Sequence, residues 1–154
     1  MAGLWLEELE PGYTVHHAVR RTVTEADNTL FSVMTMNPQP LHLDAEFSSH
    51  TEYGERLVNS LFTLGLVIGI SVYELTLGTT VANLSFDAVE FPAPVFHGDT
   101  IHVESQVVAA RASRSRPDAG IVTFEHRGYN QHDVLVARCV RNAMMRRRPA
   151  TVSA

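Results

Sequence analysis

The chain has 154 residues, of which 45% are hydrophobic and 19% charged, and its formal net charge is −5 at pH 7. This length corresponds to one domain, and the composition predicts a folded protein and excludes a disordered one. All twelve basic residues are arginine, so Schiff-base chemistry on lysine is excluded. The acidic balance argues against nucleic-acid binding, which needs a basic face. The single cysteine, Cys139, excludes an intrachain disulfide and a multi-cysteine metal site.

The start of the chain and its most apolar stretch indicate a cytoplasmic protein with no membrane partner. Residues 1–8 are acidic and lack the basic start and apolar centre of a signal peptide. The apolar stretch 60–77 includes Gly65 and Glu74 and barely reaches the roughly 20 residues that a membrane span needs. We expect a single domain over residues 1–154, with 146–154 as a flexible tail.

The first helix is predicted after residue 23. Thr24 and Asp27 have the spacing of a capping box, in which each side chain bonds to the other residue's backbone amide. We therefore expect a helix from there to about Met34, with the side chains of Leu30 and Phe31 turned inward.

The longest helix is predicted over residues 60–76, which are apolar on nearly every side. A helix without a polar face is one that protein surrounds. At about 1.5 Å per residue it is roughly 25 Å long, which is the width of a small domain.

Strands are expected before the first helix and throughout the second half. These segments are strand-like in composition, and turn residues separate those of the second half: 13–23, 80–91, 100–111, 121–130 and 134–146. Short connections between consecutive strands favour an antiparallel sheet. We therefore predict an α+β fold in which an antiparallel sheet wraps around one long central helix.

The connection after the first helix is the segment that indicates chemistry. Pro38 and Pro40 stiffen it as a loop, and it leads to a short helix that Asp44 caps and that extends to about His50. His42 lies at the end of this loop, and histidine is suited to proton transfer near neutral pH. A structural role is the alternative, because the chain has eight histidines and most histidines do not catalyse reactions.

Two motifs resemble those of a known family. The first has the family's frame Asp-x-Asn-Pro-Leu/Ile-His-x-Asp, onto which Asn37, Pro40, Leu41, His42 and Asp44 fall. The second is Pro-Val-Phe-His-Gly-Asp at residues 94–99. With both motifs, the sequence resembles the MaoC-like hydratases, which include the R-specific enoyl-CoA hydratases, over about residues 10–146. The resemblance implies the hot-dog fold, and dimers whose sheets join edge to edge.

The sequence departs from the family at the catalytic aspartate. That position holds Asn37, and the family's asparagine position holds Gln39. His42 is therefore expected to act on water without a carboxylate partner, with Asn37 orienting the water or the imidazole. A substrate with its own carboxylate would explain the exchange, because two carboxylates about 4 Å apart in a partly dry pocket repel by several kcal/mol. Hydratases of branched dicarboxylic acyl-CoA esters, such as mesaconyl- or itaconyl-CoA, are the subgroup that the sequence resembles most.

The start of the long helix aligns with a family segment whose backbone amide holds the thioester oxygen. The resemblance implies this role for the Ser60 amide, with Asn59 beside it; simple N-capping is the alternative. Gln39 and Arg56 are candidates for substrate contacts, and Arg56 would pair with a substrate carboxylate.

Two arginines in one loop are candidates for binding the phosphates of coenzyme A. Arg114 and Arg116 lie in one loop, and arginine binds phosphate through its planar guanidinium; a solvated turn is the alternative. We expect no metal site, because His16 and His17 would point to opposite faces of a strand.

These observations predict a hydro-lyase that reversibly adds water to the double bond of a short, branched or dicarboxylic enoyl-CoA. Coenzyme A enters as part of the substrate, no other cofactor is expected, and the assembly is expected to be a homodimer or higher homo-oligomer. Two alternatives remain open. One is a hot-dog acyl-CoA thioesterase with Asp27 or Glu46 as its carboxylate, and the other is a non-catalytic partner subunit of a heteromeric hydratase.

Overall fold

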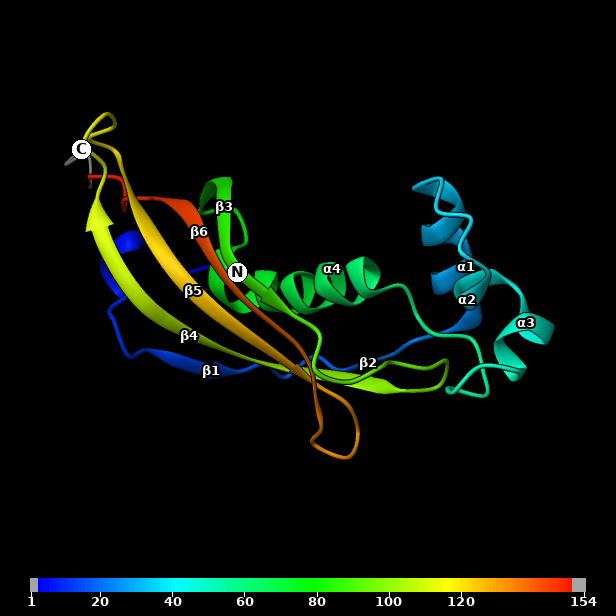
Figure 1. Ribbon diagram of the computed structural model, residues 1–154. Helices are drawn as coiled ribbons and strands as arrows, with labels where there is room; N and C mark the ends of the chain where they lie inside the picture. Colours follow the sequence, from blue (N-terminus) through cyan, green and yellow to red (C-terminus); the bar gives the residue numbers. More distant parts are fainter. Residues whose placement is uncertain (1–2, 151–154) are drawn as a thin grey trace.

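The computed structural model describes residues 3–150, and its largest element is a curved antiparallel sheet (Figure 1). The strands are β1 (Thr14–His16), β2 (Arg21–Thr22), β3 (Thr80–Glu90), β4 (Thr100–Ala112), β5 (Ala119–Tyr129) and β6 (Leu135–Arg146). Their order across the sheet is β1-β4-β5-β6-β3, and β2 also pairs with β4. The predicted antiparallel sheet is confirmed, and β3 forms one of its edges.

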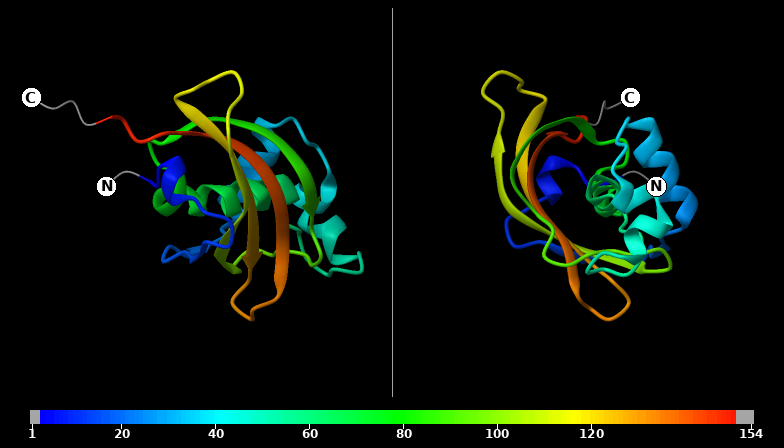
Figure 2. Two further views of the ribbon diagram at one scale, coloured as in Figure 1. Left: turned by 90° about the vertical axis from the view of Figure 1, so that its left-hand side faces the viewer. Right: turned by 45° about the vertical axis from the view of Figure 1, so that its right-hand side comes forward.

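The helix α4 (Ser60–Ser71) lies inside the curve of the sheet. Figure 2 shows the strands wrapped around this helix when it is viewed close to its axis. A π-helical turn, η2 (Val72–Thr76), continues α4 to the predicted end of the helical segment. The hot-dog arrangement is therefore confirmed. Within residues 3–150, no helix is long and apolar enough to cross a membrane.

Three further helices lie together at the N-terminal end of α4 (Figure 1): α1 (Glu25–Met34), α2 (Pro40–Leu43) and α3 (Ala45–Ser49). The predicted capping box of α1 is present, since Thr24 Oγ1 accepts from the Asp27 amide at 3.2 Å and the Asp27 carboxylate accepts from the Thr24 amide at 2.8 Å. The cap predicted for α3 is also present, because Asp44 Oδ1 accepts from the Phe47 amide at 3.0 Å.

Two expectations for these helices are wrong. Leu30 does not face the core but is 62% exposed, because Asn28 and Ser32 occupy the buried face of α1. The segment with His42 is a helical turn instead of a loop: Pro40 is the first residue of α2, a position where proline loses no hydrogen bond.

The strand expected over 13–23 is broken in two. His16 pairs with Glu104 and Arg21 with Ile101, so this segment advances five residues while its partner advances three. The two extra residues bulge out of the ladder and separate β1 from β2.

The first residues of the predicted tail are bonded to the rest of the chain. Arg146 belongs to β6, the Arg147 amide donates to the Asp118 carbonyl at 2.9 Å, and the Arg148 amide donates to the Glu7 carboxylate at 3.0 Å. Residues 151–154 of the predicted tail lie outside the described residues.

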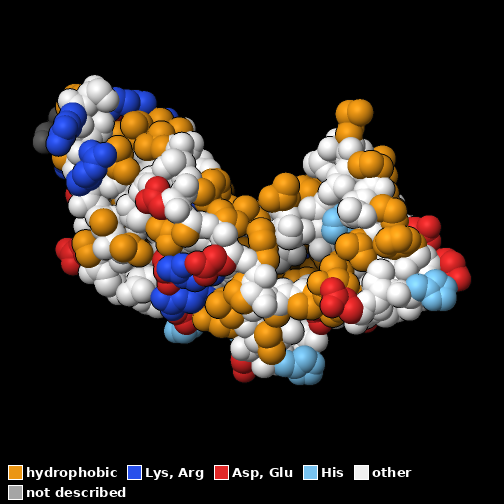
Figure 3. All heavy atoms as spheres, viewed as in Figure 1, with side chains coloured by type: hydrophobic (Ala, Val, Ile, Leu, Met, Phe, Trp, Pro, Cys, Tyr) orange, Lys and Arg blue, Asp and Glu red, His pale blue; other side chains and the backbone are white. Residues whose placement is uncertain are grey.

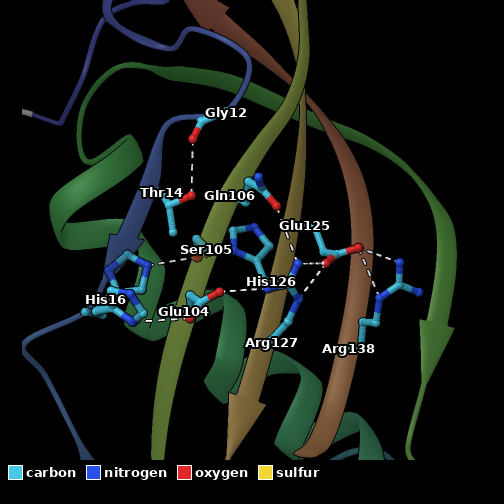
Figure 4. Close-up of polar contacts among 11 residues, drawn as sticks. Gly12, Thr14, His16, Glu104, Ser105, Gln106, Glu125, His126, Arg127 and Arg138 are labelled. Atoms are coloured by element: carbon cyan, nitrogen blue, oxygen red, sulfur yellow. Dashed lines mark hydrogen bonds and ion pairs between the residues drawn. The ribbon is translucent and has the colours of Figure 1, made fainter.

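A polar chain of hydrogen bonds crosses the buried face of the sheet. Arg141 Nε donates to His126 Nε2 at 2.8 Å, so the His126 proton is on Nδ1, which donates to Ser105 Oγ at 2.6 Å (Figure 4). Ser105 in turn donates to His17 Nε2 at 2.8 Å, and His17 Nδ1 donates to Glu74 in η2. Burial lowers the pKa of His126 well below its usual value, which keeps this imidazole neutral. The chain of bonds links β4, β5 and β6 to the far end of the central helix.

Direct packing of α4 on the sheet depends on a glycine. Val67 of α4 is fully buried, and it lies over Gly128 of β5. A Cβ atom at Gly128 would overlap Val67 Cγ2. The missing side chain therefore lets the helix approach the strand closely.

We predict that Gly128→Ala lowers the free energy of unfolding by about 1–3 kcal/mol, because overpacking displaces α4 from the sheet. Chemical denaturation measures this change. The double variant Gly128→Ala/Val67→Ala should be less destabilised than the sum of the two single variants, since the smaller side chain relieves the overlap. Strictly additive effects would contradict the assignment.

Candidate functional site

His42 lies in α2, beside the segment that leads into α4. The Leu57 amide donates to the Leu41 carbonyl at 2.9 Å, and His42 Nδ1 donates to the Leu57 carbonyl at 2.9 Å. A carbonyl oxygen only accepts, so the neutral imidazole carries its proton on Nδ1 and has a lone pair on Nε2. Nε2 makes no hydrogen bond with residues 3–150. The ring is therefore held in the tautomer in which Nε2 is the nitrogen that can accept a proton.

His42 and Ser60 line the same cavity, which has a volume of about 300 Å³. Most of the remaining lining is apolar: Tyr53, Leu57, Val58, Thr63, Phe91, Pro92, Ala93, Pro94, Val95 and Val136. None of these lining residues is acidic, and no carboxylate pairs with His42 in the described part of the chain. The structure thus places the imidazole at a cavity without an acidic partner.

The first turn of α4 forms the second polar element of this cavity. Asn59 caps the helix, with its side-chain oxygen accepting from the Leu61 amide at 3.1 Å. The Ser60 amide has no hydrogen-bond partner among residues 3–150. Unpaired amides and the helix dipole make such an end suited to hold a negatively charged oxygen. The geometry is compatible with both the oxyanion role and the capping role considered for these residues.

Asn28 connects the two elements, and sequence reasoning missed it. Its side-chain oxygen accepts from the Asn59 amide at 2.9 Å, and its Nδ2 donates to the Leu57 carbonyl at 2.9 Å. The same carbonyl oxygen accepts from His42, so Asn28 holds both the start of α4 and the group that orients the imidazole. A polar residue on the inward face of a predicted helix was the available signal.

His97, in the second motif, supports Asn28 from the other side. Its Nε2 accepts from Asn28 Nδ2 at 2.9 Å, and this requires the neutral ring. Burial lowers the pKa of His97, and the charge of Arg56 lowers it further. The neutral form that Asn28 needs is therefore favoured.

Arg56 is already paired in this structure. Its guanidinium is 2.5 Å from the Glu25 carboxylate, and its side chain is not part of the cavity lining. The pairing lowers the pKa of Glu25. A substrate carboxylate would have to displace Glu25 to reach Arg56.

Asn37 and Gln39 lie outside the cavity lining. The side-chain oxygen of Asn37 accepts from the Gln39 amide at 3.1 Å, which forms a turn directly before α2. In this structure Asn37 therefore shapes the entry to the helix that carries His42, and its side chain makes no hydrogen bond with the ring.

Arg114 and Arg116 lie at the opposite end of the molecule, between β4 and β5 (Figure 1). The 13 residues of β4 span roughly 40 Å at about 3.3 Å per residue, and β4 begins near α1 and ends at this loop. Arg116 pairs with Asp118 at 2.7 Å. One chain does not bring these arginines together with His42.

Three comparisons relate this chain to known proteins. The model of the MaoC like domain family matches residues 7–130. Mesaconyl-CoA hydratase from Cereibacter sphaeroides is 32% identical over 153 residues, which are 99% of this chain and 44% of that protein. Beta-methylmalyl-CoA dehydratase from Chloroflexus aurantiacus is 30% identical over 146 residues, which are 95% of this chain and 41% of that protein.

A solved structure confirms the fold. A conserved hypothetical protein from Mycobacterium tuberculosis, described as having a double hot-dog fold, superposes with a TM-score of 0.86 at 22% identity. The match covers 99% of this chain and 47% of that one. This chain likewise spans about half the length of the two curated relatives named above.

We predict that Asn28→Ala lowers the free energy of unfolding by about 2–4 kcal/mol, because it leaves the buried Asn59 amide and the Leu57 carbonyl without this partner. In ¹⁵N spectra, the neutral His42 ring should change from a pure Nδ1-protonated form to a mixture of tautomers.

Asn142→Ala is the matched control. Asn28 makes four side-chain hydrogen bonds, the fourth from its Nδ2 to the His42 carbonyl at 3.2 Å. Asn142 makes three, to Thr123, Ser85 and Asp87, on the outer face of the sheet. This variant should leave the His42 spectrum unchanged. The assignment is wrong if Asn28→Ala leaves the tautomer pure.

Proposed function

Because this chain belongs to the MaoC-like domain family, we propose that it is a hydro-lyase that reversibly adds water to the double bond of an enoyl-CoA. One observation carries the proposal: His42, whose Nδ1 donates to the Leu57 carbonyl and leaves the lone pair on Nε2, lines a cavity that it shares with the first turn of α4. A base and an oxyanion site that face one space are what hydration of an unsaturated thioester requires.

The reaction follows from these positions. His42 Nε2 removes a proton from water as the hydroxyl oxygen bonds to the β-carbon, and negative charge moves to the thioester oxygen. The Ser60 amide and the α4 dipole stabilise that oxygen. The imidazolium then returns a proton to the α-carbon, which completes the addition of one water molecule. Coenzyme A is part of the substrate, and the steps use no other cofactor.

We infer that the acyl group is short and branched or dicarboxylic. The cavity is small, at about 300 Å³, and its lining includes no acidic residue that would repel a substrate carboxylate. The names of the two curated relatives, mesaconyl-CoA hydratase and beta-methylmalyl-CoA dehydratase, are consistent with such a substrate.

The thioesterase alternative has less support. Asp27 is engaged in the capping box and pairs with Arg21 at 2.7 Å, and Glu46 pairs with His50 at 3.1 Å on the surface. Neither carboxylate lines the cavity of His42. The structure therefore offers no carboxylate there to activate water for thioester hydrolysis.

We predict that the protein consumes the conjugated double bond of mesaconyl-CoA, measured by absorbance, without releasing free thiol. His42→Gln should lower kcat by about 10²–10⁴-fold, because it removes the general base. His50→Gln, a change at the exposed end of α3, is the control and should keep full activity.

Other outcomes would replace the proposal. Thiol release by the wild-type protein would indicate a thioesterase. Activity that appears only after a different subunit is added, and that survives His42→Gln, would indicate a non-catalytic partner.

We also propose that a second hot-dog unit, namely a second copy of this chain, covers the apolar edge of the sheet. The edge strand β3 exposes Leu84, Phe86 and Val89, and α4 and η2 expose Leu61 and Tyr73. Figure 3 shows hydrophobic side chains gathered along the hollow between the sheet and the helical layer. A long apolar edge strand favours pairing with another strand, and the relatives contain about twice the length of this chain.

Native mass spectrometry should therefore detect a dimer. Phe86→Lys places a charge on the edge strand and should shift the population towards monomers, whereas Val134→Lys, in the exposed turn before β6, should not. A wild-type monomer at micromolar concentration would contradict the pairing.

A further inference from the structure

The hydroxyl of Thr63 is a buried polar group without a partner. Thr63 is 2% exposed, it lines the cavity of His42, and its Oγ1 makes no hydrogen bond with the described residues. Buried hydroxyls are nearly always bonded, so an unbonded one needs an explanation.

The helix itself does not satisfy this hydroxyl, although a helix can. Ser71, two turns further along α4, donates its hydroxyl hydrogen to the Ile68 carbonyl at 2.7 Å. Thr63 makes no such bond to the preceding turn. Because Thr63 lines the cavity, a ligand bound there can supply the hydrogen bond that the helix does not.

The axial offset between Ser60 and Thr63 along α4 is comparable with the length of a small dicarboxylate. Three residues along a helix correspond to a rise of about 4.5 Å. In a planar trans chain, atoms three bonds apart are about 3.8 Å apart, as across a trans peptide. The two carboxyl carbons of a trans four-carbon dicarboxylate have this separation. A thioester oxygen at the Ser60 amide would thus leave the distal carboxylate beside Thr63.

The charges around the cavity agree with this placement. Thr63 lies in the first turn of α4, where the helix dipole favours a negative group, and none of the lining residues is acidic. Arg56 is paired with Glu25 and is not a free donor. The hydroxyl of Thr63, by contrast, has no hydrogen-bond partner among the described residues.

We propose that Thr63 is a specificity-determining residue whose hydroxyl donates a hydrogen bond to the distal carboxylate of a dicarboxylic acyl-CoA. This inference rests on the proposed function and deepens it, because it assigns the preference for a dicarboxylic substrate to one side chain.

Thr63→Val tests the inference, since valine keeps the shape and removes only the hydroxyl. The readout is the dissociation constant, by calorimetry, for the unreactive methylsuccinyl-CoA and for 2-methylbutyryl-CoA, in which a methyl group replaces the distal carboxylate. Thr63→Val should weaken binding of methylsuccinyl-CoA about tenfold or more and leave that of 2-methylbutyryl-CoA nearly unchanged. The same change should appear in kcat/KM for mesaconyl-CoA against 2-methylcrotonyl-CoA.

Stability separates this role from a structural one. Thr63→Val should keep or raise the Tm of the free protein, because it removes an unpaired buried polar group. Thr79→Val is the matched control: Thr79 Oγ1 is also buried and unpaired, but it lies outside the cavity lining. This control should not change the preference for methylsuccinyl-CoA.

Each other outcome overturns a specific claim. An equal loss with both ligands would place Thr63 at the thioester or at water, and no loss would leave it without a ligand role. A lower Tm would make the hydroxyl structural. If the wild-type protein binds methylsuccinyl-CoA with the predicted preference but hydrates neither enoyl-CoA, the proposed function fails while the assignment of Thr63 stands.

Discussion

The candidate site depends on one carbonyl oxygen, that of Leu57. It accepts a hydrogen bond from His42 Nδ1 and another from Asn28 Nδ2, both at 2.9 Å. The first bond leaves the imidazole with its lone pair on Nε2. The second ties the same carbonyl to α1, and through the Asn28 oxygen to the capping residue of α4. The candidate base and the candidate oxyanion site belong to different helices and are thereby held at one cavity.

The absence of an acidic residue from the cavity lining determines which substrate charge the cavity favours. With no acidic residue in its lining, the cavity contains little negative charge, and the first turn of α4 contributes positive potential. A carboxylate on the substrate would meet attraction here, where a catalytic aspartate would repel it. This electrostatic balance, together with the unpaired hydroxyl of Thr63, links catalysis and specificity in one small space.

Most of the fold could be predicted from the sequence, because it depends on local patterns. The capping box of α1, the Asp44 cap of α3 and the apolar run of α4 each act over a few residues, and the structure has all three. The broken strand could not be predicted, because the bulge between β1 and β2 arises from pairing with a strand some 80 residues away. The exposure of Leu30 likewise depends on Asn28, whose partners come from other segments.

The candidate site was predictable only in part, for the same reason. The motif located His42, but its Nδ1 tautomer depends on the Leu57 carbonyl, which is distant in sequence. Sequence patterns also do not show that the Thr63 hydroxyl has no hydrogen-bond partner among the described residues.

The crystal structure of a complex with an unreactive acyl-CoA would test the central claim most directly. We predict that a water molecule lies about 2.6–3.2 Å from His42 Nε2 and faces the β-carbon. A β-carbon outside this cavity, or any protein carboxylate in contact with the imidazole, would contradict the account.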